Sequence, residues 1–174
     1  NGRSPHSLTS FQRSLALEED PEAWFGLARA QMSLGDLQAG EASLRQGLER
    51  APENGPRRQQ RGVNLVFQDQ PHLAVEAFTQ AARSGAAATV ESSLFWGRAL
   101  EALGDGEGAL AQYQVALELQ PTPEPGLLLT YGALLAQRLD QVDEGLQAVN
   151  QALALAPSDP VALARGGDVY FNLG

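Results

Sequence analysis

The sequence contains no cysteine, which excludes disulfides, thiolate metal ligands and cysteine nucleophiles. It also lacks lysine and isoleucine, so arginine supplies all the permanent positive side-chain charge. This bias is typical of GC-rich genomes and indicates a bacterial origin. No apolar run approaches the roughly 20 residues that cross a membrane, and the N-terminus has no apolar signal-peptide region. Because the first residue is not Met, we expect a fragment. We favour a cytoplasmic location. The alternative is a periplasmic location, if a signal peptide precedes this sequence in the natural protein.

Residues suited to catalysis are scarce. The two histidines, His6 and His72, are predicted to lie in an N-terminal tail and at a helix start. The glycine-rich segment 104–108 follows no strand, so it is interpreted as a turn and not as a phosphate-binding loop. Asp140 and Asp143 do not have calcium-loop spacing, and helix capping explains them better. The sequence therefore predicts no enzyme, no catalytic residue, no metal and no cofactor.

The charge balance is acidic. The formal net charge is -9 and the pI is about 4.6, although 43% of the residues are hydrophobic. An acidic surface repels phosphate backbones, which disfavours nucleic-acid binding. The apolar fraction is sufficient for a continuous core, which disfavours disorder. These features indicate a folded protein that does not bind nucleic acid through its overall charge.

A small residue recurs along the whole chain at a nearly constant interval. The spacings are 34, 35, 35 and 35 residues, and the positions are Ala28, Gly62, Gly97, Gly132 and Gly167. Three further registers of small residues or proline repeat in phase with it. A stack of identical supersecondary units has this signature. We expect residues 1–20 to form a tail with an orphan helix near 8–18. The repeat array is expected to cover 21–174, with units near 21–54, 55–88, 90–123 and 125–159 and a partial unit at 160–174.

Each unit is predicted to contain two antiparallel helices, A and B, of about 14 residues or roughly 21 Å. In the first unit, Asp20 and Pro21 are expected to start helix A, and Gly35 to end it in a left-handed conformation. The small residue at the eighth place of helix A is expected to let helix B cross closely. Stability then depends on stacking of neighbouring helices.

The pattern resembles the tetratricopeptide repeat, whose signature includes Trp, Leu, Gly, Tyr, Ala, Phe and Pro over 34 residues. The first unit carries Trp24, Leu27, Ala28 and Pro52, and the third carries Gly97 and Tyr113 in the same phase. The resemblance covers residues 20–174. It implies an all-α, right-handed superhelical solenoid that acts as a non-enzymatic scaffold and binds a peptide or helix of a partner in a concave groove.

In that family, places 2, 5, 9 and 12 of helix A line the groove. Carried over to this sequence, the resemblance implies the following groove residues: Phe25, Arg29, Met32, Gln59, Val63, Val66, Leu94, Arg98, Glu101 and Leu129. Arg29 and Arg98 share the ninth place and would accept acidic side chains, unless they pair with neighbours such as Glu101 or are solvated. Exchange of both for Glu is predicted to weaken partner binding and leave the helices intact.

Two relatives of this pattern fit less well. Chaperone-binding members hold a terminal carboxylate with Lys and Asn, and this chain has no Lys. RNA-binding pentatricopeptide repeats have a similar period, but the acidic charge disfavours them. Arg58 and Arg61 depart from the pattern at apolar places. We expect their stems to pack and their heads to reach water; the alternative is an anion site formed with Arg57.

The fifth unit consists of an A helix without its B partner. An apolar surface is therefore expected at this end, formed by Val161, Val169, Tyr170, Phe171 and Leu173. We expect the natural protein to continue past Gly174 and cover it. The alternative is homo-oligomerisation through this helix.

Overall fold

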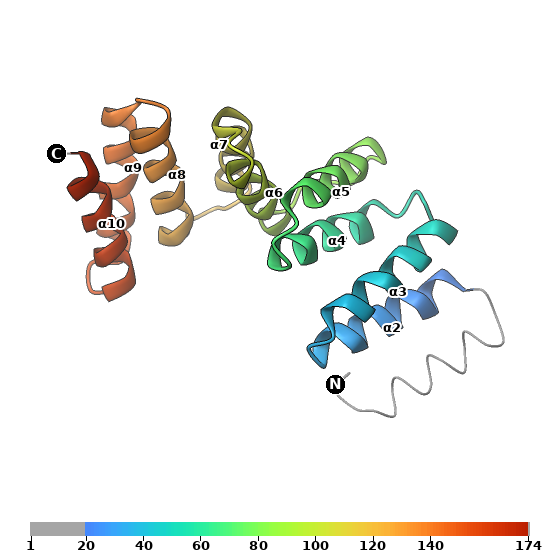
Figure 1. Cartoon of the computed structure of the whole chain (residues 1–174). Coiled ribbons are helices and arrows are strands. Elements are labelled where there is room, and N and C mark those ends of the chain that lie inside the picture. The colour runs from blue at the N-terminus through green and yellow to red at the C-terminus, as the bar shows by residue number, and fades with distance from the viewer. Residues whose placement is uncertain (1–19, 174) are drawn as a thin grey trace. The chain divides into compact units, whose positions relative to one another are not determined.

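The computed structural model describes residues 20–173, and the expected helix at 8–18 lies outside them. The described part contains helices and no strand (Figure 1), which confirms the all-α fold class. The chain divides into two compact units, residues 1–87 and 88–174. Each unit is built from consecutive antiparallel helices, as the alternation of apolar helices and short turns predicts.

The first unit contains two helix pairs. Helices α2 (Pro21–Ser33) and α3 (Leu37–Arg50) pack as one pair, and α4 (Gly55–Phe67) and α5 (Pro71–Arg83) as the other. Helix α3 also contacts α4 and joins the pairs. Phe25, Ala28, Leu44 and Leu48 form a core cluster between α2 and α3.

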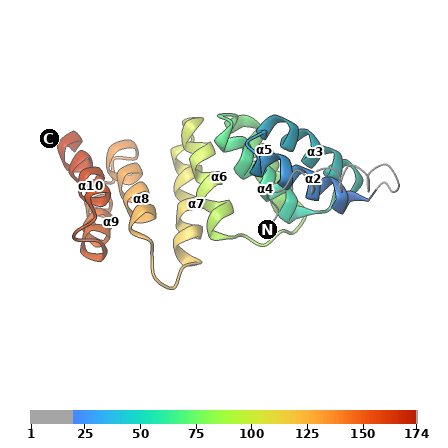
Figure 2. The same cartoon turned by 90° about the horizontal axis from the view of Figure 1, so that it is seen from below.

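The second unit contains α6 (Val90–Ala102), α7 (Gly106–Glu118), α8 (Pro125–Arg138), α9 (Val142–Leu155) and α10 (Pro160–Leu173). Helices α6 and α7 pair, as do α8 and α9, and α7 also contacts α8. Helix α10 packs against both α8 and α9, beside which it runs in Figures 1 and 2. Tyr113 is fully buried in the α6–α7 part of the core, and Val149 in the α8–α9 part.

The turn that connects the two helices of a pair contains a residue in the left-handed conformation, which is glycine in two pairs and aspartate in the other two. Gly35 and Gly104 have φ of 87° and 82°, and the aspartate that follows each glycine accepts a hydrogen bond from the start of the next helix. In the other two pairs Asp69 and Asp140 occupy the left-handed position, each with φ of 55°. Short polar side chains tolerate this conformation better than most non-glycine residues do.

The cap predicted for the fourth B helix is wrong in its detail. The N-cap residue of α9 is Gln141, and no side chain accepts a hydrogen bond there. Asp140 has the left-handed backbone conformation of the turn, while Asp143 and Glu144 lie in the first turn of the helix. Acidic side chains in that turn still interact favourably with the helix dipole. The cap predicted at Asp20 is confirmed, since its Oδ1 accepts from the Glu22 amide at 3.0 Å.

The recurring glycines are sites of close approach between helices. A Cβ on Gly62 would lie 2.7 Å from the Phe78 ring, and one on Gly132 would lie 2.6 Å from the Gly145 carbonyl oxygen. A Cβ on Gly97 would overlap the Tyr113 ring. Gly167, at the same place of α10, has no heavy atom within 4 Å of its Cβ position. The small residue is therefore needed only where a B helix crosses.

Candidate functional site

The exposed part of the predicted groove is concentrated at the ninth place of the A helices. Arg29 in α2 and Arg98 in α6 are both exposed. The other predicted residues that retain partial exposure are Met32, Gln59, Val66, Leu94 and Glu101. These positions lie in two separate units, so each unit offers its own A-helix surface.

Phe25 is not available to a ligand, which corrects the expectation that its ring is part of the groove floor. The side chain is only 2% exposed. Its ring lies against Gly47 of α3, and the guanidinium of Arg57 covers it at 4.9 Å from the ring centroid. The physical reason is that α3 and the Arg57 side chain of α4 cover this ring, whereas Leu94, at the same fifth place of α6, keeps partial exposure.

Leu129 and Val63 are also buried, at 2% and 8% exposure. Leu129 belongs to the core cluster of α8, α9 and α10, which includes Val149 and Val169. Three of the six apolar residues expected in the groove, Phe25, Val63 and Leu129, are therefore core residues, while Met32, Val66 and Leu94 keep partial exposure. Among the predicted groove residues, those at the ninth and twelfth places that are exposed at least in part are the polar Arg29, Arg98 and Glu101 and the apolar Met32 and Val66.

The three arginines of α4 are engaged by internal partners. Arg61 Nε donates to Glu41 Oε1 of α3 at 2.7 Å, and both side chains are 18% exposed. Arg58 bonds to the Pro52 carbonyl and the Gln80 side chain, and Arg57 pairs with Glu22. The expectation that the Arg61 head reaches water is thus wrong, and the guanidinium groups do not converge on an open anion site.

Glu101 is held in place by the core. The buried Tyr113 hydroxyl donates to Glu101 Oε2 at 2.8 Å across the α6–α7 pair. Burial raises the pKa of the Tyr113 phenol far above its usual value, and the charge of Glu101 and this hydrogen bond add to the rise. Arg98 does not pair with Glu101 in the described part of the chain; its guanidinium lies 5.1 Å from the Phe95 ring centroid.

A shallow hollow of about 300 Å³ opens beside these residues. Arg98, Glu101 and Ala102 of α6 line one side, and Arg138, in the last turn of α8, lines the other. Across the described residues, neither arginine forms a salt bridge or a hydrogen bond. Two guanidinium groups without a salt-bridge partner and one oriented carboxylate give the hollow a net positive charge. Sequence reasoning missed Arg138 because it lies beyond the twelfth place of its helix.

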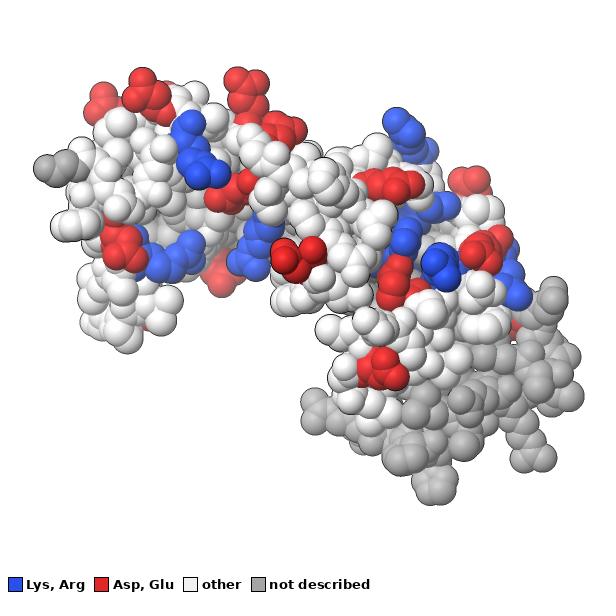
Figure 3. All heavy atoms as spheres, in the orientation of Figure 1, with Lys and Arg blue, Asp and Glu red and all other residues white. Residues whose placement is uncertain are grey.

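The second unit segregates its charges. It has three arginines against eleven acidic residues, and Arg98, Arg138 and Arg165 all lie on the A helices α6, α8 and α10. Arg165 donates to the Thr130 hydroxyl at 2.9 Å, which ties α10 to α8. Figure 3 shows arginine side chains of this unit, at the left of the view, on one face with acidic side chains nearby. The B helices α7 and α9 carry no basic residue.

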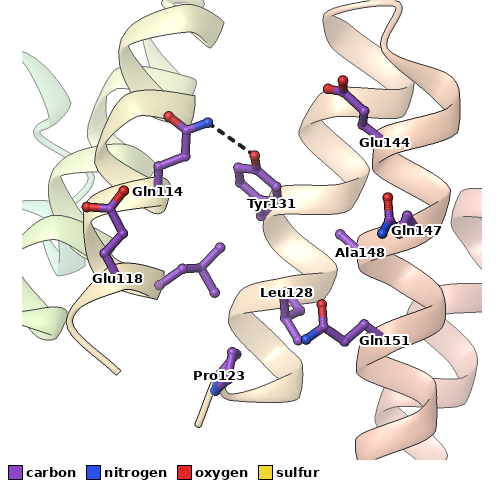
Figure 4. A pocket seen from close by; sticks show the side chains of 10 residues that line it. Gln114, Glu118, Pro123, Leu128, Tyr131, Glu144, Gln147, Ala148 and Gln151 are labelled. Atoms are coloured by element: carbon purple, nitrogen blue, oxygen red, sulfur yellow. Dashed lines mark hydrogen bonds between the residues drawn. The ribbon is translucent and has the colours of Figure 1, made fainter. Parts of the chain in front are cut away.

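A larger hollow of about 550 Å³ lies between α7, α8 and α9 (Figure 4). Its lining residues are Gln114, Leu117, Glu118, Pro123, Leu128, Tyr131, Glu144, Gln147, Ala148 and Gln151. This site was not predicted from the sequence, because the groove that the resemblance implies is confined to the faces of the A helices. The sequence feature that could have indicated this site is the helical spacing of polar residues on the B helices, such as Gln114 and Glu118.

Several apolar side chains of α10 are exposed, alongside the charged residues Arg165 and Asp168. Phe171 is 86% exposed, and Val161 and Tyr170 are also exposed. Val169 is instead buried at 3%, and Leu173 is partly buried against the same cluster, so these two do not belong to an open surface. The Tyr170 hydroxyl donates to Asn150 Oδ1 of α9 at 2.7 Å. The exposed apolar area is smaller than the sequence predicts.

The described residues contain neither a side-chain cluster suited to a metal ion nor a helix suited to crossing a membrane. In residues 20–173, no group of three or more His, Asp or Glu side chains is placed to hold a metal ion. Within the same range, no helix is long and apolar enough to span a membrane. The described helices and their charged, shallow hollows define a helical-repeat protein whose surfaces suit other polypeptides.

The comparisons with known proteins identify which helical repeat this is. The sequence pattern of the tetratricopeptide repeat family matches residues 1–55 and 60–122. The chain therefore belongs to the tetratricopeptide repeat family, whose members are protein–protein interaction scaffolds and generally not enzymes. A segment of 78 residues is 36% identical to the BBSome complex member bbs-4 of Caenorhabditis elegans. That segment is 45% of this chain, and it spans only 16% of the relative's length.

Solved structures show the same fold. YrrB, described as a TPR protein with an unusual peptide-binding site, aligns with a TM-score of 0.80 at 22% identity. The alignment covers 92% of this chain and 81% of YrrB. MamA from Desulfovibrio magneticus RS-1 aligns with a TM-score of 0.73 at 22% identity, over 88% of this chain and 85% of MamA. At this identity the likeness establishes the fold.

Proposed function

We propose that the A-helix surface of the second unit binds a segment of a partner protein, and that a carboxylate of this segment is received between Arg98 and Arg138. The observation that supports it is the hollow that these two unpaired arginines line. Guanidinium groups form short, charge-assisted hydrogen bonds to carboxylates in a forked geometry. Glu101 adds an acceptor for a backbone or side-chain N–H of the same segment.

The surrounding acidity does not prevent this binding. The net charge of the second unit is -8, but its B helices and turns carry most of the acidic side chains. Exposed charges separated by more than a Debye length of about 8 Å are largely screened at physiological salt. The two arginines therefore dominate the potential close to the hollow. On the first unit, Arg29 is exposed at the same ninth place of its helix and offers a single cationic side chain.

A peptide array tests the proposal. Peptides that place Asp or Glu among apolar residues are compared with matched peptides that carry Asn or Gln. We expect the acidic series to bind more tightly, and Arg98→Glu with Arg138→Glu to lower its affinity about 10- to 100-fold, because charge-assisted hydrogen bonds contribute about 1.5–3 kcal/mol. Arg29→Glu combined with Arg98→Glu measures the share of the first unit.

The control is Arg83→Glu, which reverses the charge of one arginine on the B helix α5, outside the hollow. It should leave the affinity unchanged, and circular dichroism should show the same helicity in all variants. Equal affinity for the acidic and amide series, or an equal loss in the Arg83 variant, would contradict the proposal. Affinity capture followed by mass spectrometry then identifies the natural partner.

Self-assembly through α10 is the second candidate function. The observation that favours it is the exposed set of Val161, Leu163, Tyr170 and Phe171, with exposures between 42% and 86%. A helix that exposes several large apolar side chains is a candidate contact surface. A second copy of the chain is the occupant that we propose for this surface.

A further inference from the structure

The hollow between α7 and α9 has an apolar floor and two polar rims. Leu128 and Ala148, 4% and 7% exposed, form the floor together with Leu117. Gln114 and Glu118 stand on the α7 rim, and Figure 4 shows Glu144, Gln147 and Gln151 on the opposite α9 rim. Binding sites commonly combine such a floor with a few placed polar groups, and their volumes of about 300–1,000 Å³ include this one.

The rim residues have the spacing of continuous helical faces. Gln114 and Glu118 are four residues apart, and Glu144, Gln147 and Gln151 follow each other at three and four. Side chains at these spacings lie above one another on a helix. The α9 rim therefore extends over about 10 Å at 1.5 Å per residue. This length suits a side chain and its neighbours in a bound segment better than a small ion.

The acceptor atoms on the rims are available. Over the described residues, Glu118 and Glu144 form no ion pair and Gln147 and Gln151 form no hydrogen bond. Gln114 donates its Nε2 to the Tyr131 hydroxyl at 3.2 Å, so its carbonyl oxygen stays free to accept. The rims thus present carboxylate and carboxamide oxygens to the same space.

The charge around the hollow has one sign. Its lining contains two carboxylates and no basic side chain, and neither α7 nor α9 carries an arginine. All three arginines of the unit lie on the A helices. A surface with this potential attracts cationic partners and disfavours anionic ones.

We propose that this hollow is a second binding surface, which takes a basic segment of a partner protein. An Arg or Lys side chain lies across the floor, its methylene stem on Leu117 and Leu128, and its charged head reaches Glu118 and Glu144. Long basic side chains commonly bury their stems in this way while the head keeps polar contacts. The surface is distinct from the arginine-lined hollow, so the two sites bind segments of opposite charge.

The test uses the full chain and a fluorescent peptide in which Arg alternates with Leu and Ala. A matched peptide carries Gln in place of each Arg. We expect Glu118→Gln with Glu144→Gln to weaken binding of the Arg peptide about tenfold, since each exposed ion pair contributes up to about 1 kcal/mol. Both positions are exposed, so the fold is retained.

The matched control is Glu107→Gln with Asp143→Asn, which removes the same two charges from the same two helices outside the hollow. An affinity loss in the control equal to that in the first variant, or equal binding of the two peptides, would overturn the proposal. Arg98→Glu with Arg138→Glu should leave this binding intact, which separates the result from that of the carboxylate site.

A fluorescent dye can also locate the bound peptide. Because the chain has no cysteine, the substitution Gln151→Cys creates a single labelling site at the hollow, and a spectral shift of the dye reports a peptide bound there.

Discussion

At the scale of single residues, Tyr113 links the core to the surface. Its ring fills the space left by Gly97, and its hydroxyl orients Glu101, which lines the arginine hollow. The repeat places Tyr113 in phase with the family pattern, but its hydrogen bond to Glu101 was not predicted, because the partner lies twelve residues away on another helix. One buried hydroxyl therefore connects the stability of the α6–α7 pair to the site.

The raised pKa of Tyr113 predicts an alkaline loss of stability. Since the folded state favours the neutral phenol, its contribution is fully present below the unfolded pKa of about 10 and is lost as the pH rises above it. The free energy of unfolding should fall by up to about 1.4 kcal/mol per pH unit there. Urea titrations between pH 8 and pH 12 measure the slope. Lysine and cysteine are absent and add nothing to it.

Tyr113→Phe should remove the decrease in the free energy of unfolding above about pH 10, whatever the substitution does to stability at neutral pH. Tyr170→Phe, at an exposed tyrosine, is the control and should keep it. A slope in Tyr113→Phe as steep as that of the original chain would show that another group is responsible.

At the scale of helices, the close crossing of A and B decides which residues are tolerated. Gly62, Gly97 and Gly132 each face a B-helix atom that leaves no space for a Cβ. The periodicity of small residues predicts this crossing. It could not predict that Phe25 and Leu129 would be buried, because neighbouring helices, and Arg57 over Phe25, cover these side chains. Together with Val63, these side chains are half of the six apolar residues expected in the groove.

Glycine substitutions at one repeat place should have opposite effects. Gly97→Ala is expected to destabilise the chain by about 1–3 kcal/mol, because its Cβ overlaps the Tyr113 ring. Gly167→Ala, where nothing lies within 4 Å, should stabilise it by about 0.5–1 kcal/mol through helix propensity. Urea denaturation followed by circular dichroism measures both. A loss of stability in both variants would mean that α10 is also crossed closely.

At the scale of the whole molecule, the two compact units differ in charge. Residues 1–87 have a net charge of -1 and residues 88–174 one of -8, although the sequence repeats with the same period through both. The repeat therefore fixes the architecture and leaves the surface free to vary. We assign partner binding chiefly to the second unit, whose three arginines all lie on the A helices, while most of its acidic residues lie on the B helices and in the turns.

Self-assembly is tested on the whole chain by sedimentation velocity over a range of concentrations. We expect a dimer to accumulate with concentration and to disappear in Val161→Glu with Phe171→Glu, because two charges would enter an apolar contact. Leu119→Glu, at an exposed leucine outside α10, is the control and should still dimerise. A single monomeric species at every concentration would remove this candidate.

The sequence by itself determined the helices, their pairing and the family, because periodic small residues, capping aspartates and turn glycines act within one repeat. Only the tertiary structure decided which side chains are available to a partner. Arg61 pairs with Glu41 of another helix, and Arg138 meets Arg98 at one hollow across helices. The rims of the second hollow come from two helices that are far apart in the sequence. Exposure and charge at these sites depend on neighbouring helices, and a pattern within one repeat does not specify them.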